Sequence, residues 1–136
     1  DRQIKYGPCV EIHEPVFSTA QLIEEYKGAR IFAYPSLAEK GETFGLAILE
    51  AMSCGCVPFV SSLACFREFL ENSRTGFVFD HKGENCRDSL KSGLCETILN
   101  DSGQETVSRE ARNAAKSFEL EEVSDRYLKD FALLLA

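Results

Sequence analysis

Residues 42–58 read ETFGLAILEAMSCGCVP, and this stretch decides the fold class of the chain. Residues 44–52 are mostly good helix formers, and Gly55 supplies the glycine with which helices commonly end. The apolar run that follows, residues 58–61, predicts a strand, because its leading proline is tolerated at the first position of a strand. A helix that leads directly into a short apolar strand is typical of a parallel α/β sheet.

The same alternation of strands and helices extends to both sides of this stretch. Ile31 to Tyr34 is continuously apolar, as expected for a strand covered on both faces. Ser18 and Gln21 stand three residues apart and have the pattern of a capping box at a helix start. We therefore predict one domain over residues 1–136. Its strands are expected at residues 10–12, 31–34, 58–61 and 77–79, and its helices at 18–28, 44–52, around 65–70, 87–99, 104–117 and from 120 to the end.

Length and charge exclude several classes of protein. The chain has 136 residues, 44% of them apolar, and 15 Lys and Arg stand against 22 Asp and Glu. The formal net charge of −7 argues against a surface for nucleic acid or anionic lipid, because both need a basic patch. No apolar run approaches the roughly 20 residues of a membrane span.

The cysteines are interpreted as free thiols of a protein in a reducing cytosol. A chain of this length with an aliphatic core does not need disulfides for stability. The two histidines, His13 and His81, do not lie beside a cysteine pair, so no metal site is predicted. The six cysteines are Cys9, Cys54, Cys56, Cys65, Cys86 and Cys95.

Two glutamates flank the start of the central helix, Glu42 before it and Glu50 within it. The first amides of a helix are unpaired donors at the positive end of its dipole, which suits a phosphate. At 1.5 Å per residue the two carboxylates are about 12 Å apart, close to the separation of a hexose from the ribose of the nucleotide that carries it. Carboxylates accept hydrogen bonds from sugar hydroxyls. The spacing equally fits a glutamate that complements the helix dipole and another in solvent, so the residues alone leave both interpretations open.

The chain resembles the carboxyl-terminal domain of the family-four retaining glycosyltransferases over about residues 10–135. The central pattern pairs two glutamates separated by seven residues, and Glu42 and Glu50 match it. The resemblance implies a Rossmann-like parallel sheet with flanking helices, as the truncated, incomplete C-terminal half of a two-domain GT-B architecture. The residues that carry it are Pro35-Ser36, Glu42-x-Phe44-Gly45-Leu46-x-x-Leu49-Glu50-Ala51-Met52-x-Cys54-Gly55-x-x-Pro58 and Thr75-Gly76-Phe77-Val78.

The resemblance also implies roles in binding a nucleotide-diphosphate sugar. Glu42 would hold hydroxyls of the transferred sugar, and Glu50 would hold those of the ribose. The remaining expected contacts are Thr43, Phe44 and Gly45 with the sugar, Gly45, Leu46 and Lys40 with the diphosphate, and Val16 with the nucleobase.

For the full-length protein the resemblance implies a retaining hexosyltransferase of polysaccharide or cell-envelope synthesis. Its acceptor would be a glycan or a lipid-linked molecule held by an N-terminal domain, with no metal or other cofactor. We expect a cytoplasmic protein, peripheral at the inner face of the membrane, and expect the present chain alone to be inactive. A sheet edge left without its neighbouring strand would invite self-association.

The chain departs from the family pattern in ways that keep two alternatives open. Leu63 and Ala64 stand where two glycines are frequent, and the basic Arg and Lys pair that grips the diphosphate would precede residue 1. One alternative is a degenerate, non-catalytic transferase module with a role in assembly or regulation. The other is a domain like those of the sugar-nucleotide epimerases, which share the architecture but not the central motif.

Overall fold

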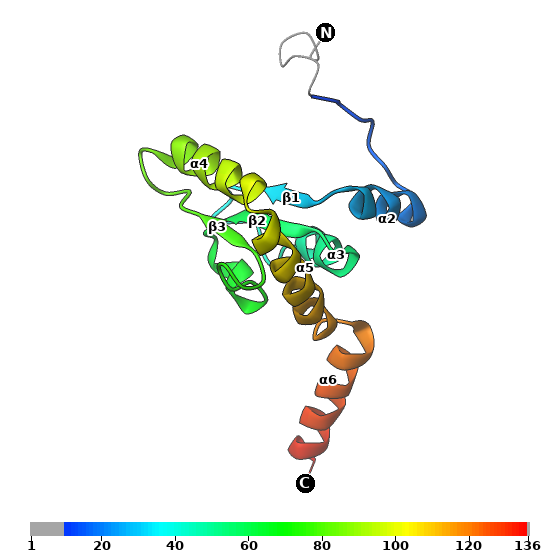
Figure 1. Cartoon of the computed structure of the whole chain (residues 1–136). Helices are drawn as coiled ribbons and strands as arrows, with labels where there is room; N and C mark the ends of the chain where they lie inside the picture. The colour runs from blue at the N-terminus through cyan, green and yellow to red at the C-terminus, as the bar shows by residue number, and fades with distance from the viewer. Residues whose placement is uncertain (1–9, 136) are drawn as a thin grey trace.

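A three-stranded parallel sheet forms the centre of the molecule in the computed structural model, which describes residues 10–135. The strands are β1 (Ile31–Tyr34), β2 (Val57–Ser61) and β3 (Phe77–Phe79), in the spatial order β1-β2-β3. Ile31 pairs with Val57, and Phe59 pairs with Phe77. The predicted α/β class and three of the four predicted strands are therefore confirmed (Figure 1).

The helices surround this sheet at nearly the predicted positions. The predicted segment around residues 65–70 is a short 3-10 helix, η1, rather than an α-helix. The central helix begins at Leu46 instead of Phe44 because Gly45 adopts a left-handed conformation, with φ 83° and ψ 47°. The helical elements are α2 (Thr19–Gly28), α3 (Leu46–Cys54), η1 (Ala64–Glu68), α4 (Cys86–Leu99), α5 (Asp101–Lys116) and α6 (Leu120–Leu134).

The middle strand β2 is buried on both faces. Val60 belongs to a core cluster with Ile48 of α3 and Ala111 of α5, which places these two helices on one side. The neighbouring Phe59 points to the opposite side, since side chains alternate along a strand. There its ring stacks on Phe79 at 5.5 Å, and Gly93 of α4 lies against it. Helices on both faces explain why β2 reads as an unbroken apolar run.

The edge strand β1 is less covered than predicted. Three of its four residues are half-buried and Ala33 is exposed. The reason is that α4 packs on β3 and α5 on β2, so that less of the molecule reaches the edge. Burial on both faces was therefore the wrong expectation for residues 31–34.

The amino-terminal segment corrects two further predictions. Residues 10–12 form no strand, and the side chains of Val10 and Ile12 are 38% and 53% exposed. A strand needs a neighbour for its backbone hydrogen bonds, and residues 10–12 pair with no strand of the described part. The capping box is absent too: Ser18 is the N-cap of α2, yet its side chain makes no capping hydrogen bond.

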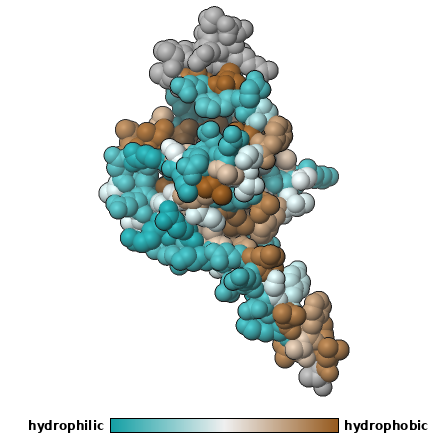
Figure 2. Space-filling view, turned by 90° about the vertical axis from the view of Figure 1, so that its right-hand side faces the viewer, coloured by the Kyte–Doolittle hydropathy of each residue, from teal (hydrophilic) through white to brown (hydrophobic). Residues whose placement is uncertain are grey.

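The last helix, α6, extends away from the sheet and buries none of its residues (Figure 1). In Figure 2 apolar side chains lie open along its outer end. They include Tyr127, Leu128, Phe131, Leu133 and Leu134. None of the helices between residues 10 and 135 is both long enough and apolar enough to cross a membrane.

The cysteines within the described residues are free thiols, as predicted. Burial raises the pKa of Cys56 and of Cys65, which makes both weak nucleophiles at neutral pH. Cys9 lies outside the described residues. The five free cysteines are Cys54, Cys56, Cys65, Cys86 and Cys95.

Candidate functional site

The start of α3 is a helix terminus without a capping side chain. Its N-cap is Gly45, which has no side chain to accept a hydrogen bond, and the first turn contains no acidic residue. The Ile48 amide of this turn donates to the Gly45 carbonyl oxygen at 2.9 Å, so the amides of Leu46 and Ala47 are the donors left for another partner, at the positive end of the helix dipole. Such a terminus can receive an anion.

Both side-chain packing and backbone conformation require a glycine at position 45. A Cβ at this position would lie 2.7 Å from Cε1 of Phe66 and 3.0 Å from Cδ1 of Ile48. Positive φ adds strain for any other residue. The glycine thus lets Phe66, which is 2% exposed, pack directly under the helix start.

Each of the two glutamates that flank this terminus has a tyrosine beside it. The Tyr34 hydroxyl donates a hydrogen bond of 2.8 Å to Oε2 of Glu42, which is half-buried. The Tyr26 hydroxyl lies 3.5 Å from Oε2 of Glu50, a longer and weaker contact to an exposed side chain.

These contacts raise the pKa of both tyrosines. The hydrogen bond to Glu42 is the largest cause that raises the pKa of Tyr34, followed by burial. Burial is the largest cause that raises the pKa of Tyr26, followed by the charge of Glu50. Both phenols therefore remain protonated at neutral pH and can donate to the carboxyl groups beside them.

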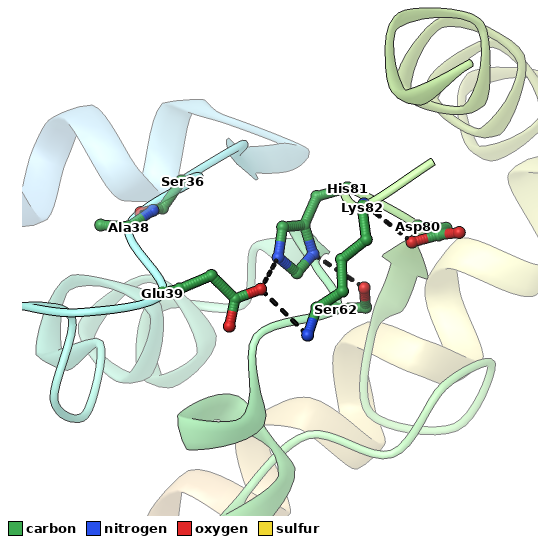
Figure 3. Close-up of polar contacts among 7 residues, drawn as sticks. All are labelled: Ser36, Ala38, Glu39, Ser62, Asp80, His81 and Lys82. Carbon is green, nitrogen blue, oxygen red and sulfur yellow. Dashed lines mark hydrogen bonds and ion pairs between the residues drawn. The ribbon is translucent and has the colours of Figure 1, made fainter. Parts of the chain in front are cut away.

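A second polar cluster fastens the loop that leads to Glu42. The ring of His81 lies between Glu39 and Ser62, with Nε2 2.6 Å from Oε1 of Glu39 and Nδ1 2.8 Å from Oγ of Ser62 (Figure 3). Lys82 adds an ion pair of 3.1 Å to the same Glu39 oxygen. The hydrogen bond from His81 is the largest cause that lowers the pKa of Glu39, and Lys82 is the next.

This cluster joins the carboxyl ends of all three strands. Glu39 follows β1, Ser62 follows β2, and His81 follows β3 by two residues. In open parallel sheets ligands bind at this edge. His81 is 8% exposed and Ser62 is half-buried, so the cluster is a structural anchor for residues 37–41, with the side chains of Glu39 and Lys82 exposed at the surface.

Sequence reasoning missed Tyr26, Tyr34, Glu39, Ser62 and His81 as parts of this region. Two signals could have found some of them. A tyrosine in an apolar run requires a partner for its hydroxyl, and a histidine within two residues of a strand end lies at the ligand edge of a parallel sheet.

The other predicted site residues lie around the same helix start, with one exception. Thr43 is exposed, and the Phe44 ring packs inward against Phe69 and Phe118 at 5.5 and 5.7 Å. Leu46 is 63% exposed. Lys40 lies in the exposed loop. Val16 is the exception: it belongs to the irregular segment before α2, where it is half-buried.

No group of three or more His, Cys, Asp or Glu side chains that could hold a metal ion occurs within residues 10–135. The expectation that binding needs no metal remains a prediction.

Comparison with known proteins gives a consistent family. The family described as "Glycosyl transferases group 1" matches residues 10–116. The O-antigen chain mannosyltransferase B of Escherichia coli is 32% identical over 109 residues, which are 80% of this chain and 26% of that protein. The D-inositol 3-phosphate glycosyltransferase of Rhodococcus jostii is 25% identical over 115 residues, 83% of this chain and 24% of that protein.

The fold is also found in solved structures. The Anabaena protein HepE, solved in complex with UDP-glucose, has a TM-score of 0.61 at 22% identity, over 85% of this chain and 30% of that one. This similarity confirms the Rossmann-like fold of the GT-B enzymes. The chain spans less than a third of the length of each of these relatives.

Proposed function

The chain belongs to the glycosyl transferases group 1 family, and we propose that it binds the nucleotide-diphosphate sugar used as donor in a glycosyl transfer. The observation that carries the proposal is the uncapped start of α3 between Glu42 and Glu50. An anion-binding helix terminus with a carboxylate on either side suits a diphosphate with a sugar at one end and a ribose at the other.

The proposed roles follow the order of the groups in such a ligand. Glu42 accepts hydrogen bonds from hydroxyls of the transferred sugar, and Glu50 accepts them from the ribose. The amides of residues 43–46 face the sugar and the diphosphate, with Lys40 near the phosphates and Val16 near the base. Neutralisation of the leaving diphosphate by helix amides is electrostatic stabilisation of the transition state.

For the protein as a whole we propose transfer with retention of anomeric configuration to a glycan or lipid-linked acceptor. The O-antigen mannosyltransferase among the relatives supports a role in polysaccharide synthesis. Acceptor binding and turnover would need parts that this chain does not supply, so binding without transfer is the activity proposed for the chain itself.

The proposal is tested by the affinities of the Glu42→Gln and Glu50→Gln variants, measured by isothermal titration. UDP-glucose, GDP-mannose and ADP-glucose serve as ligands beside UDP, GDP and ADP. Glu42→Gln should weaken binding of the nucleotide sugar about tenfold and leave the nucleotide unchanged, because it loses a charge-assisted hydrogen bond to the sugar. Glu50→Gln should weaken the binding of the nucleotide sugar and of the nucleotide alike, because both contain the ribose.

Glu96→Gln, on the exposed side of α4, is the matched control and should change neither affinity. If the unaltered chain binds none of the six ligands, the proposed function is wrong.

A further inference from the structure

Tyr34 is the last residue of β1, and its hydroxyl reaches the loop beyond the strand. It donates its hydrogen bond to Oε2 of Glu42, eight residues later in the chain, at 2.8 Å. This is a normal length for an O–H···O bond, and a bond to a charged acceptor is stronger than one between neutral groups. The contact therefore fixes the orientation of the Glu42 carboxylate.

Neighbouring rings hold the phenol in place. Tyr34 stacks on Phe32 with 6.0 Å between ring centroids and 18° between the planes. Phe66 meets it edge-on, at 6.1 Å and 71°. Phe66 also fills the space beneath Gly45, so one buried ring positions both the tyrosine and the start of α3.

The bond leaves acceptor capacity on the glutamate. A carboxylate has about four lone-pair sites on two oxygens, and the phenol uses one of them on Oε2. Oε1 remains for a ligand. A phenol also has no positive charge, so it orients the carboxylate without neutralising it as an arginine would.

We propose that Tyr34 is a positioning residue for sugar binding, which holds Glu42 so that its free oxygen receives the hydroxyls of the donor sugar. The inference rests on the proposed function and adds to it the residue on which sugar recognition depends. Tyr26 stands in a weaker relation to Glu50, because its contact is 3.5 Å long.

The test is Tyr34→Phe in the full 136-residue chain, a change that keeps the ring and its packing. UDP-glucose, GDP-mannose and ADP-glucose are titrated by calorimetry beside UDP, GDP and ADP. We expect about tenfold weaker binding of the nucleotide sugar that the unaltered chain prefers, which corresponds to about 1.4 kcal/mol. The affinity for the matching nucleotide should not change.

Two further variants separate positioning from a general loss of structure. Tyr127→Phe, at a tyrosine of α6 that is 60% exposed, is the control and should behave as the unaltered chain. In a Glu42→Ala background, Tyr34→Phe should have no further effect on sugar binding, because the tyrosine acts only through that carboxylate.

The inference is overturned if Tyr34→Phe weakens the nucleotide and the nucleotide sugar equally, or weakens neither. The inference is also overturned if Tyr34→Phe weakens sugar binding as much in the Glu42→Ala background as it does in the unaltered chain. In each of these cases binding by the unaltered chain leaves the proposed function intact. If the unaltered chain binds none of the ligands, the proposed function fails and this inference falls with it.

Discussion

The ring of Phe66 occupies the space that a side chain on residue 45 would need, with Cε1 only 2.7 Å from the position of a Cβ. Gly45 also has a φ of 83°, which other residues adopt with strain. The start of α3 thus depends on a glycine for packing and for conformation at once. Gly45→Ala should lower the free energy of unfolding by about 2 kcal/mol.

Urea denaturation measures this loss, and Gly28→Ala is the matched control. Gly28 is the last residue of α2, and a Cβ there would meet nothing within 4 Å. The control should be neutral or slightly stabilising, since alanine favours helix. Equal stability of both variants would show that Phe66 does not pack against residue 45 in this way.

Truncation of a side chain in the middle of the sheet should cause the largest loss of stability. Phe59 is 1% exposed and lies between Phe79 and Gly93 of α4. Phe59→Ala leaves a cavity and should cost about 3–5 kcal/mol in chemical denaturation. Phe131→Ala on α6, where the ring is 56% exposed, is the control and should cost about 0.5 kcal/mol or less. A similar cost at both positions would argue against the described core.

The three strands could be predicted from their apolar runs, and the site only in part. Residues 31–34, 58–61 and 77–79 are apolar runs, and such runs form strands wherever a sheet can cover them. Val10 and Ile12, on either side of Glu11, also favour a strand locally, yet residues 10–12 form none, because pairing depends on neighbours that a local pattern does not contain. Glu42, Gly45 and Glu50 were accessible to sequence reasoning since they share one motif.

The contacts that hold this motif were not predictable, because they connect distant residues. Tyr26 and Glu50 are 24 positions apart, and Glu39 and His81 are 42 apart. The local sequence around each of these residues does not indicate which distant residue it contacts. Only the sheet, which brings the ends of three parallel strands to one edge, places these groups together.

The anchor of the loop before Glu42 should respond to acid. His81 and then Lys82 hold the pKa of Glu39 below its ordinary value of 4.5. A lowered pKa stabilises the fold at every pH above the ordinary value, and this stabilisation is lost as the pH falls through the lowered one. NMR titration of the Glu39 carboxyl carbon should give a midpoint below 4.5.

His81→Gln should move that midpoint up toward the ordinary value, and Lys82→Ala should move it by less. An unchanged Glu39 midpoint in His81→Gln would mean that the histidine does not hold this carboxylate.

The Tyr34 phenol provides the corresponding test at high pH. Its pKa is raised above the ordinary value of 10.0, chiefly by the hydrogen bond to Glu42. The hydrogen bond from the protonated phenol stabilises the folded state fully below pH 10.0, and this stabilisation is lost as the pH rises through the raised pKa. Titration of the Tyr34 ring carbon by NMR should show this, and Glu42→Gln should bring the pKa down. An unchanged pKa in that variant would contradict the contact.

The most direct test of the central claim is a residue-resolved NMR titration of the chain with UDP-glucose, GDP-mannose and ADP-glucose. If the start of α3 binds a nucleotide-diphosphate sugar, the amide signals of residues 43–46 and of Glu50 shift in saturable fashion with at least one ligand. Amides of α4 around Glu96 then stay in place. Saturable shifts that leave residues 43–50 unaffected, or no shifts with any of the three ligands, would contradict the account.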